Sequence, residues 1–434
     1  PPALPLHRAD PGAADPGATG TATGTATGTA TGTGTATSPG ASAVPTDPQA
    51  VDTLAGPARP YRALRHARAA FWSPVILDGG RAGTFLGMAS AGADLVGRHR
   101  WQAWAAVNPA DGLWQGLAAW EWAGLGRPVL TLRAEREWDW IGRAVLPDGS
   151  ERDVLSREDR LALLAAVPWQ RWRRSLTVSA GPELVRRHRV MEAAGEHRLR
   201  NPDDRLLGAV LRAGYADYQV HALGISRQDG VSVGAALRQR WDMEEEPDAE
   251  GGYREALGSA AAYVGLGRVG FADAVLAGRA SGLLRQGGGA RPTGIGGASG
   301  GVGLALGGLE QEASLLLPVR GFEEGDRAGT RAWTASAELR VPLALVGRGV
   351  RLLPIFLDRV SATAFADAGG ADCPARPAPV TCGPPGVLVS TGGELVLDAA
   401  LGFRQVVRLR FGTAFPLRGP GREPVFHVRV GASF

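Results

Sequence analysis

The sequence predicts an all-β fold: a 16-stranded antiparallel transmembrane β-barrel over residues 61–434, preceded by a disordered low-complexity linker over residues 1–60. Three observations predict this fold. Many segments alternate apolar and polar side chains, as strands with one lipid face and one wet face must. Short links between these segments alternate with longer polar links, and the chain ends on an alternating segment with a terminal phenylalanine.

The first 60 residues repeat glycine, threonine and alanine with no apolar period, as in GATGTATGTATGTATGTGTATSPG. Such a segment cannot bury enough surface to offset the entropy of ordering, so we expect a flexible linker. The first ten residues, PPALPLHRAD, have neither the basic nor the apolar region of a signal peptide. We therefore expect the chain to be a processed product or a fragment of a longer one.

The segments that follow carry charged side chains at every second position. In residues 129–140, Arg133 and Glu135 share one face and Leu132 lies on the other, and residues 333–341 alternate in the same way. This pattern excludes a sheet that is buried on both faces. A soluble sandwich also alternates, and the 12 tryptophans alone fit a soluble Trp-rich core equally well. Large apolar residues on one face of so many strands, with tryptophan at strand ends, favour the barrel.

Link lengths indicate the number of strands. Short links are expected at 97–98, 124–128, 172–174, 227–230 and 266–268, and longer ones at 108–112, 142–159, 190–204 and 244–252. Counting with this alternation places eleven strands before the glycine-rich stretch 284–330 and five after it. An even total puts both ends of a closed barrel on one side of the membrane. Pro74 has no N–H to donate, which predicts a weakly paired first strand.

The closing strand is expected in the last ten residues, VFHVRVGASF. Successive strand side chains point to opposite faces, so His427 and Arg429 should face the lumen. The lipid-facing residues should be Phe426, Val428, Val430 and Phe434.

The two cysteines, Cys373 and Cys382, lie in the proline-rich loop ADCPARPAPVTCGPPG with eight residues between them. In an oxidising envelope compartment we expect a disulfide between them rather than free thiols. The sequence contains no HExxH, His-Cys cluster or Gly-x-Ser-x-Gly motif. We therefore predict no metal, no cofactor and no enzymatic activity.

Three motifs follow one another in the last third of the chain. The first is VRGF, formed by Val319, Arg320, Gly321 and Phe322. The second is E-x-R-x-P, formed by Glu338, Arg340 and Pro342, and the third is F-x-D-x-G, formed by Phe365, Asp367 and Gly369. With these motifs in this order, residues 70–434 resemble the bacterial surface antigen family, the BamA- and TamA-like outer-membrane barrels that include the two-partner secretion translocators.

The resemblance implies that the VRGF motif is the tip of the sixth outside loop, folded back into the lumen. An arginine in a partly dry lumen needs an acidic partner. Glu338, Arg340 and Asp367 are expected to point into the lumen on the two strands after the loop, where a bidentate contact with a carboxylate would hold Arg320. The alternative is an ordinary solvated loop arginine at this position.

Two functions remain open. The resemblance implies an outer-membrane translocase or insertase whose VRGF loop braces or gates the lumen, with unfolded outer-membrane or secreted polypeptides as substrates. The family carries POTRA domains before the barrel, whereas a repetitive linker stands here. Residues 60–75 are similar to the junction after a TolB-like propeller, so the alternative is a membrane anchor or passive pore serving an upstream soluble domain.

The expected location is the bacterial outer membrane, and the expected partners include its lipids and lipopolysaccharide. The chain has no lysine, so all 47 basic residues are arginines, and they are not gathered into a patch for nucleic acid. One arginine set could contact lipopolysaccharide phosphates or simply lie at the barrel rim. It comprises Arg160, Arg171, Arg173, Arg174, Arg186, Arg187 and Arg189.

Overall fold

The computed structural model describes residues 61, 63–78, 82–145, 151–193, 196–199, 204–243, 251–297, 317–323, 325–349, 352–353, 355–374, 385–401 and 405–430. The predicted linker over residues 1–60 lies outside this range. Apart from the short helix α2 (Ala63–His66), the regular structure of the described chain is strand. No helix in that part of the chain has the length and apolar character needed to cross a membrane.

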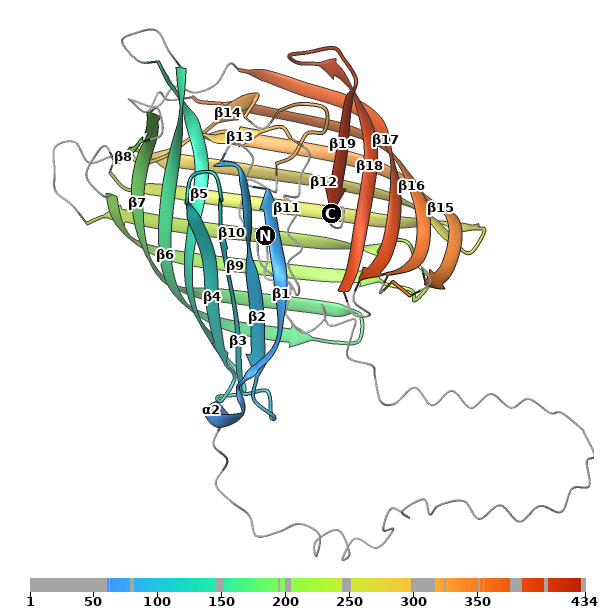
Figure 1. The fold of residues 1–434 in the computed structure, drawn as a ribbon, viewed down its shortest axis with the longest axis horizontal. Helices are drawn as coiled ribbons and strands as arrows, with labels where there is room; N and C mark the ends of the chain where they lie inside the picture. The colour runs from blue at the N-terminus through green and yellow to red at the C-terminus, as the bar shows by residue number, and fades with distance from the viewer. Residues whose placement is uncertain are drawn as a thin grey trace, which may run out of the picture.

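Seventeen of the described strands form one curved antiparallel sheet (Figure 1). The shortest, β8 (Glu196–Leu199), pairs only with the end of β7, beyond the pairing of β7 with β9, so sixteen strands make the wall. Eleven of these sixteen precede the long loop and five follow it, which confirms the predicted fold class. Their bounds are β1 (Ala69–Asp78), β2 (Thr84–Ala93), β3 (His99–Val107), β4 (Trp114–Trp122), β5 (Val129–Val145), β6 (Glu151–Gln170), β7 (Arg174–Ala193), β9 (Asp204–Gln219), β10 (Gln228–Asp242), β11 (Tyr253–Val269), β12 (Ala272–Gly287), β15 (Arg331–Gly349), β16 (Ile355–Asp372), β17 (Gly386–Leu401), β18 (Gln405–Arg418) and β19 (Val425–Val430).

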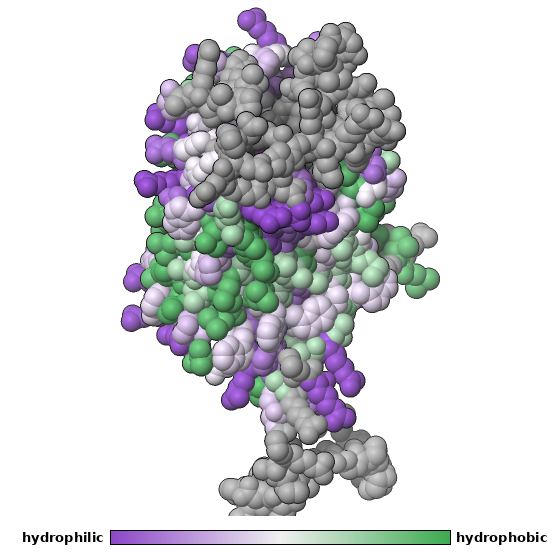
Figure 2. Space-filling model, turned by 90° about the vertical axis from the view of Figure 1, so that its left-hand side faces the viewer, coloured by the Kyte–Doolittle hydropathy of each residue, from purple (hydrophilic) through white to green (hydrophobic). Residues whose placement is uncertain are grey.

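The wall turns many charged side chains into the lumen and exposes many large apolar side chains on its outer surface. On β15, Glu338 is only 1% exposed, whereas its neighbour Leu339 is 40% exposed. The tryptophans do not form a soluble core, because Trp172 and Trp333 are exposed on the outer surface. Figure 2 shows the resulting apolar belt on one side of the barrel. This distribution is that of a transmembrane barrel, which meets lipid outside and polar groups inside.

The first and last strands form the two edges of the sheet (Figure 1). The first strand, β1, pairs with β2 along its length, and Pro74 lies opposite Met88. The last strand, β19, pairs with β18. None of the described registers joins β1 to β19, so the sheet is not closed between them.

Several predicted link boundaries were wrong. The predicted link 142–159 is instead a strand hairpin, since β5 continues to Val145 and β6 begins at Glu151. The predicted link 190–204 likewise contains the end of β7 and all of β8. In these segments the sequence does not alternate cleanly between apolar and polar residues, so the period-two signal of a strand was missing. The turn predicted at 266–268 forms slightly later, because β11 continues to Val269 and Gly270, with a φ of +67°, begins the turn to β12.

The structure divides the arginine set that the sequence suggested as a possible lipopolysaccharide contact. Arg171 and Arg173 lie in the turn before β7, whereas residues 186–189 lie near the far end of that strand. Twelve strand residues separate Arg174 from Arg186, which is roughly 40 Å along the strand. Arg160 and Arg187 are buried in the lumen. The set is therefore not one surface patch.

Candidate functional site: a loop tip held in the lumen

The long loop between β12 and β15 folds back into the barrel. Its short strand β13 (Thr293–Ile295) pairs with β14 (Arg327–Gly329), which holds the two arms of the loop together. Gly297 forms a bridge with Val319 and donates its N–H to the carbonyl of Phe322 at 2.9 Å. The VRGF tip is thus packed against the first arm of its own loop.

Arg320 is 4% exposed and contacts two strands of the wall at once. On β16, its Nε donates to Oδ2 of Asp367 at 2.6 Å and its Nη2 donates to Oδ1 at 2.7 Å. On β15, its Nη1 donates to Oε1 of Glu338 at 2.8 Å. Its guanidinium carbon lies 3.6 Å from the centroid of the Phe365 ring. A bidentate, stacked arginine of this kind cannot be replaced by lysine without loss of geometry.

Arg340 and Glu338 form a second contact next to Arg320. Arg340 donates from Nε to Oε2 of Glu338 at 2.8 Å, so the two oxygens of Glu338 bind two different arginines. Ser336 accepts from Nη2 of Arg320 at 3.0 Å and donates to Oδ1 of Asp367 at 2.6 Å. The structure therefore brings together the loop tip and all three of the lumen residues that the sequence analysis selected.

Glu394 on β17 is a member of this site that sequence reasoning missed. One of its carboxylate oxygens lies 3.4 Å from Nη1 of Arg320 and accepts from Nε of Arg410 at 2.8 Å. The other oxygen contacts His427 Nε2 at 2.9 Å and also accepts from Arg429. Because Arg410 lies on β18 and His427 and Arg429 lie on β19, Glu394 links the loop tip to the last three strands. The signal for it was present, since Glu394 is the charged, inward member of an alternating strand.

Apolar contacts hold the rest of the tip. Val319 and Phe322 are buried in a cluster with Ile295 of the loop and Leu388 of β17. Gly321 has a φ of +90°, and a Cβ built on it would lie 3.0 Å from the Cβ of Ala414. Glycine suits this position because it tolerates the left-handed region and the close approach of β18.

Small residues on the wall make room for the tip, and Gly369 on β16 gives a direct test. A Cβ at this position would lie 2.7 Å from Val319 Cγ2 and 2.9 Å from Thr334 Cγ2. We expect Gly369→Ala to push the tip away and to lower the free energy of unfolding by about 1–3 kcal/mol through overpacking. Heat-dependent mobility on gels and limited proteolysis of the loop would measure this.

The matched control for this change is Gly393→Ala on the neighbouring strand β17. A Cβ there would meet nothing closer than the Thr363 carbonyl oxygen at 3.7 Å, an ordinary contact. Equal proteolysis of the two variants would show that the tip does not depend on the space beside Gly369.

A second anchor holds the base of the loop across the barrel. Arg291 is 7% exposed; its Nη1 donates to Ser156 Oγ of β6 at 2.6 Å and its Nη2 donates to Asp204 Oδ2 of β9 at 3.1 Å. Its carbonyl accepts from Arg285 of β12 at 3.1 Å. No motif signalled this residue, because its partners lie 135 and 87 residues away in the sequence.

A network of buried ion pairs lines the lumen side of β7, β10, β11 and β12. Arg240 Nε donates to Glu183 at 2.7 Å, and both side chains are 2% exposed or less. Glu255 accepts from Arg238 at 2.6 Å and from Arg285 at 2.7 Å. Buried charges are costly unless they are paired, so this wall is held by alternating arginines and carboxylates.

The remaining predicted residues lie elsewhere. On the closing strand, Phe426 and Val428 are 81% and 64% exposed, whereas Arg429 is 7% exposed and faces the lumen. Val430 pairs with Leu409, and Phe434 lies outside the described residues. Cys373 Sγ accepts from the Thr330 N–H at 3.3 Å. Cys382 lies outside the described residues, so the disulfide stays a prediction.

Among the described residues, no three His, Cys, Asp or Glu side chains gather in a way that could hold a metal ion. The buried carboxylates of the lumen are instead engaged by arginines, which is the chemistry of a scaffold rather than of a metal centre.

Comparison with known proteins shows the fold. No protein-family model and no curated protein sequence matches the chain. Among solved structures, CdiB from Escherichia coli matches 83% of this chain with a TM-score of 0.56 and 12% identity. BamA from Haemophilus ducreyi lacking POTRA domains 1–3 matches 84% with a TM-score of 0.52 and 14% identity.

CdiB from Acinetobacter baumannii matches 83% of the chain with a TM-score of 0.51 and 10% identity. The match covers 61% and 59% of the two CdiB structures and 70% of the BamA structure, so the chain spans less than two thirds of the CdiB structures. At such low sequence identity these matches establish only the fold. The chain has the fold of the BamA- and CdiB-like outer-membrane β-barrels.

Proposed function

We propose that this chain lies in the bacterial outer membrane and translocates or inserts unfolded polypeptides, with the VRGF tip as the internal brace of the barrel. The observation that carries the proposal is the buried Arg320, which joins one loop to Asp367 and Glu338 on two strands.

The tip is placed so that it could couple the lumen to the edge of the sheet. Ser390 of β17 donates to the Arg320 carbonyl, and Glu394 of the same strand binds Arg410 and Arg429. A movement of the tip therefore changes the contacts of β18 and β19. The edges β1 and β19, which no described register joins, would form a lateral seam through which a polypeptide strand could leave toward the membrane.

The second candidate is a membrane anchor or passive pore that serves an upstream soluble domain, such as a TolB-like propeller. The repetitive glycine-, threonine- and alanine-rich composition of residues 1–60 favours it, because such a composition is typical of linkers to a tethered domain. The buried ion pairs of the lumen favour it as well, since they would also stabilise a rigid plugged barrel.

A transport assay separates these candidates. The purified chain would be reconstituted into liposomes, and an unfolded outer-membrane polypeptide would be added with a protease outside the vesicles. Acceleration of its insertion or uptake over empty liposomes is expected for a translocase or insertase. Conductance without such acceleration would support a passive pore and would reject our proposal, and the absence of both would support an anchor.

A further inference from the structure

The link over residues 220–227, called the lumen turn below, is the longest link between described strands on the side of the barrel where β1 begins. It connects β9 to β10 over eight residues, whereas the other links between described strands on that side have six residues or fewer. Val220 and Leu223 of the lumen turn are exposed, but Ile225 is buried. Short links face the periplasm in outer-membrane barrels, so the lumen turn lies at the periplasmic mouth of the lumen.

The lumen turn reaches strands far from its own. Arg359 of β16 donates from Nη1 to the carbonyl of Gly224 at 2.7 Å and from Nη2 to the carbonyl of Ala222 at 3.2 Å. Arg408 of β18 donates from Nη2 to the carbonyl of Ile225 at 3.2 Å. Along the paired strands, β16 lies four strands from β10 and β18 lies six. The turn therefore crosses the mouth of the lumen.

A β-bulge lies where the lumen turn enters β10. The register between β9 and β10 shifts between Gln228 and Val231, and Asp229 adopts a φ of +46° in the left-handed region. Oδ1 of Asp229 accepts from the N–H of Gly265 on β11 at 2.8 Å, which fixes the bulge to the wall. A bulge bends its strand and changes the direction of the residues beside it, so this one accounts for the inward path of the turn.

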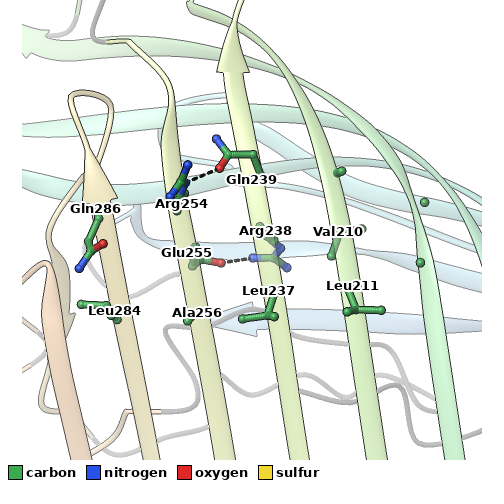
Figure 3. A pocket seen from close by; sticks show the side chains of 13 residues that line it. Val210, Leu211, Leu237, Arg238, Gln239, Arg254, Glu255, Ala256, Leu284 and Gln286 are labelled. Atoms are coloured by element: carbon green, nitrogen blue, oxygen red, sulfur yellow. Dashed lines mark hydrogen bonds and ion pairs between the residues drawn. The ribbon is translucent and has the colours of Figure 1, made fainter.

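The wall that carries the lumen turn is held by contacts of its own. Arg238 of β10 donates to Glu255 of β11 at 2.6 Å (Figure 3), and Arg240 of β10 donates to Glu183 of β7 at 2.7 Å. These ion pairs do not involve the turn. A movement of residues 220–227 can therefore leave the strands in place.

The two arginines that bind the turn are also positioned by the wall. Arg408 donates from Nε to Oδ1 of Asp398 at 2.5 Å and from Nη2 to Oδ2 at 2.7 Å, a bidentate contact. Arg359 donates from Nε to Oδ2 of Asp358 at 2.7 Å and lies opposite Asp398 in the register. Both guanidiniums would keep their place if the turn moved away. Arg359 and Arg408 are called the mouth arginines below.

The mouth arginines bind the main chain of the turn. Each of the three hydrogen bonds described above ends on a carbonyl oxygen, of Ala222, Gly224 or Ile225, and not on a side chain. Every polypeptide carries such oxygens at every residue, whatever its sequence. A guanidinium held by a carboxylate can donate to them without reading side chains, which is the recognition that unfolded polypeptides of differing sequence require.

The lumen turn is also joined to the VRGF tip. Ser226 of the turn accepts from Nη1 of Arg340, and Arg340 donates from Nε to Oε2 of Glu338 at 2.8 Å. The other oxygen of Glu338 accepts from Arg320 at 2.8 Å. Three consecutive polar contacts thus connect the turn to the tip, so displacement of the turn removes one support of the site around Arg320.

We propose that the mouth arginines bind the main chain of an extended polypeptide that enters the lumen, and that the lumen turn occupies this site until a polypeptide displaces it. The inference rests on the proposed function and deepens it, because it names where the substrate chain is held at the periplasmic mouth. The turn is then a lid made from the barrel's own chain.

The test measures, by fluorescence anisotropy, how the full chain in detergent micelles binds a labelled, unfolded peptide of about twenty glycine, serine and threonine residues. In a shortened variant, Asn-Gly replaces residues 220–227 and closes a hairpin between Gln219 and Gln228, which are already paired. The peptide should bind this variant about ten-fold or more tightly than the unchanged chain, because the site is no longer covered. Ile225→Ala, which only loosens the seat of the turn, should act in the same direction.

The mouth arginines are then changed in the shortened variant. Arg359→Gln/Arg408→Gln should weaken peptide binding by about ten-fold or more, since the charge-assisted hydrogen bonds are lost. Arg359→Gln alone should weaken it in the same direction. The matched control is Arg98→Gln/Arg268→Gln, which removes two exposed arginines on the same side of the barrel and should leave binding unaltered. Heat-dependent gel mobility would verify that each variant is folded.

Several results would overturn the proposal. Equal affinity of the peptide for the shortened variant and the unchanged chain would mean that the turn covers no site. Unaltered affinity after Arg359→Gln/Arg408→Gln, or an equal loss in the control pair, would remove the mouth arginines from recognition. Larger conductance of the shortened variant without peptide binding would show that the turn only blocks the lumen.

The peptide titration needs neither liposomes nor transport, so its outcome is separate from that of the transport assay. A chain that binds the peptide through the mouth arginines but moves no polypeptide would retain this site and reject the proposed function. A chain that accelerates polypeptide insertion equally with and without the mouth arginines would retain the function and reject the site.

Discussion

Replacing Arg320 by alanine is expected to release the loop tip and to lower the free energy of unfolding by about 3–5 kcal/mol. The change leaves Asp367 buried without its arginine, while Glu338 loses Arg320 and keeps Arg340, and an uncompensated buried charge carries a cost of this size. The tip would then move in the lumen. We expect more frequent and larger conductance steps in planar bilayers, together with faster proteolysis of the loop.

Two further variants make the Arg320 result specific. Arg320→Lys keeps the charge but loses the bidentate contact and the stacking on Phe365, so it should fall between alanine and the unchanged chain. Arg422→Ala, at an exposed position in the link between β18 and β19, should behave as the unchanged chain. If Arg320→Ala showed unaltered conductance and unaltered protease resistance, the tip would be neither brace nor gate.

Replacing Glu394 by glutamine is expected to have the second large effect. The change keeps the shape of the side chain but removes the negative charge that Arg410 and Arg429 share. Two buried guanidiniums would then lack that carboxylate, which we expect to lower the free energy of unfolding by about 3–5 kcal/mol. Hydrogen exchange should accelerate in β18 and β19, because Glu394 connects these strands to the loop tip.

The control for Glu394→Gln is Glu423→Gln, an exposed position in the last link. A double-mutant cycle of Glu394→Gln with Arg429→Gln should show a coupling energy, because the two side chains are in contact. Simple additivity in that cycle, or exchange rates in β19 equal to those of the control, would show that Glu394 does not hold the edge of the sheet.

The architecture could be predicted because strand alternation is a local signal. In residues 333–341 the two-residue period of a strand puts Glu338 and Trp333 on opposite faces. The structure places Glu338 inside the barrel and Trp333 outside it. The strand count followed from the same rule. The link boundaries were less predictable, because β5 and β6 stay paired with each other through residues that do not alternate cleanly between apolar and polar.

The site could be predicted only where a motif was compact. The VRGF tip, Glu338 and Asp367 belong to motifs that follow one another along the chain, and the family resemblance identified all of them together. Arg291 and Glu394 lack such a signal. Each is one charged residue among many on an alternating strand or loop. The curvature of the sheet determines which side chain it meets.

By itself, the chain's pattern of residues determined that a sheet forms, which face meets lipid and where the long loop interrupts the strands. These features depend on the period of two along each strand and on the local cost of placing polar groups in lipid. Only the folded barrel decided which charges meet across the lumen. Arg291 reaches strands 87 and 135 residues away, and Arg186 meets Arg205 through their register, because curvature and pairing bring distant segments together in ways that no local pattern encodes.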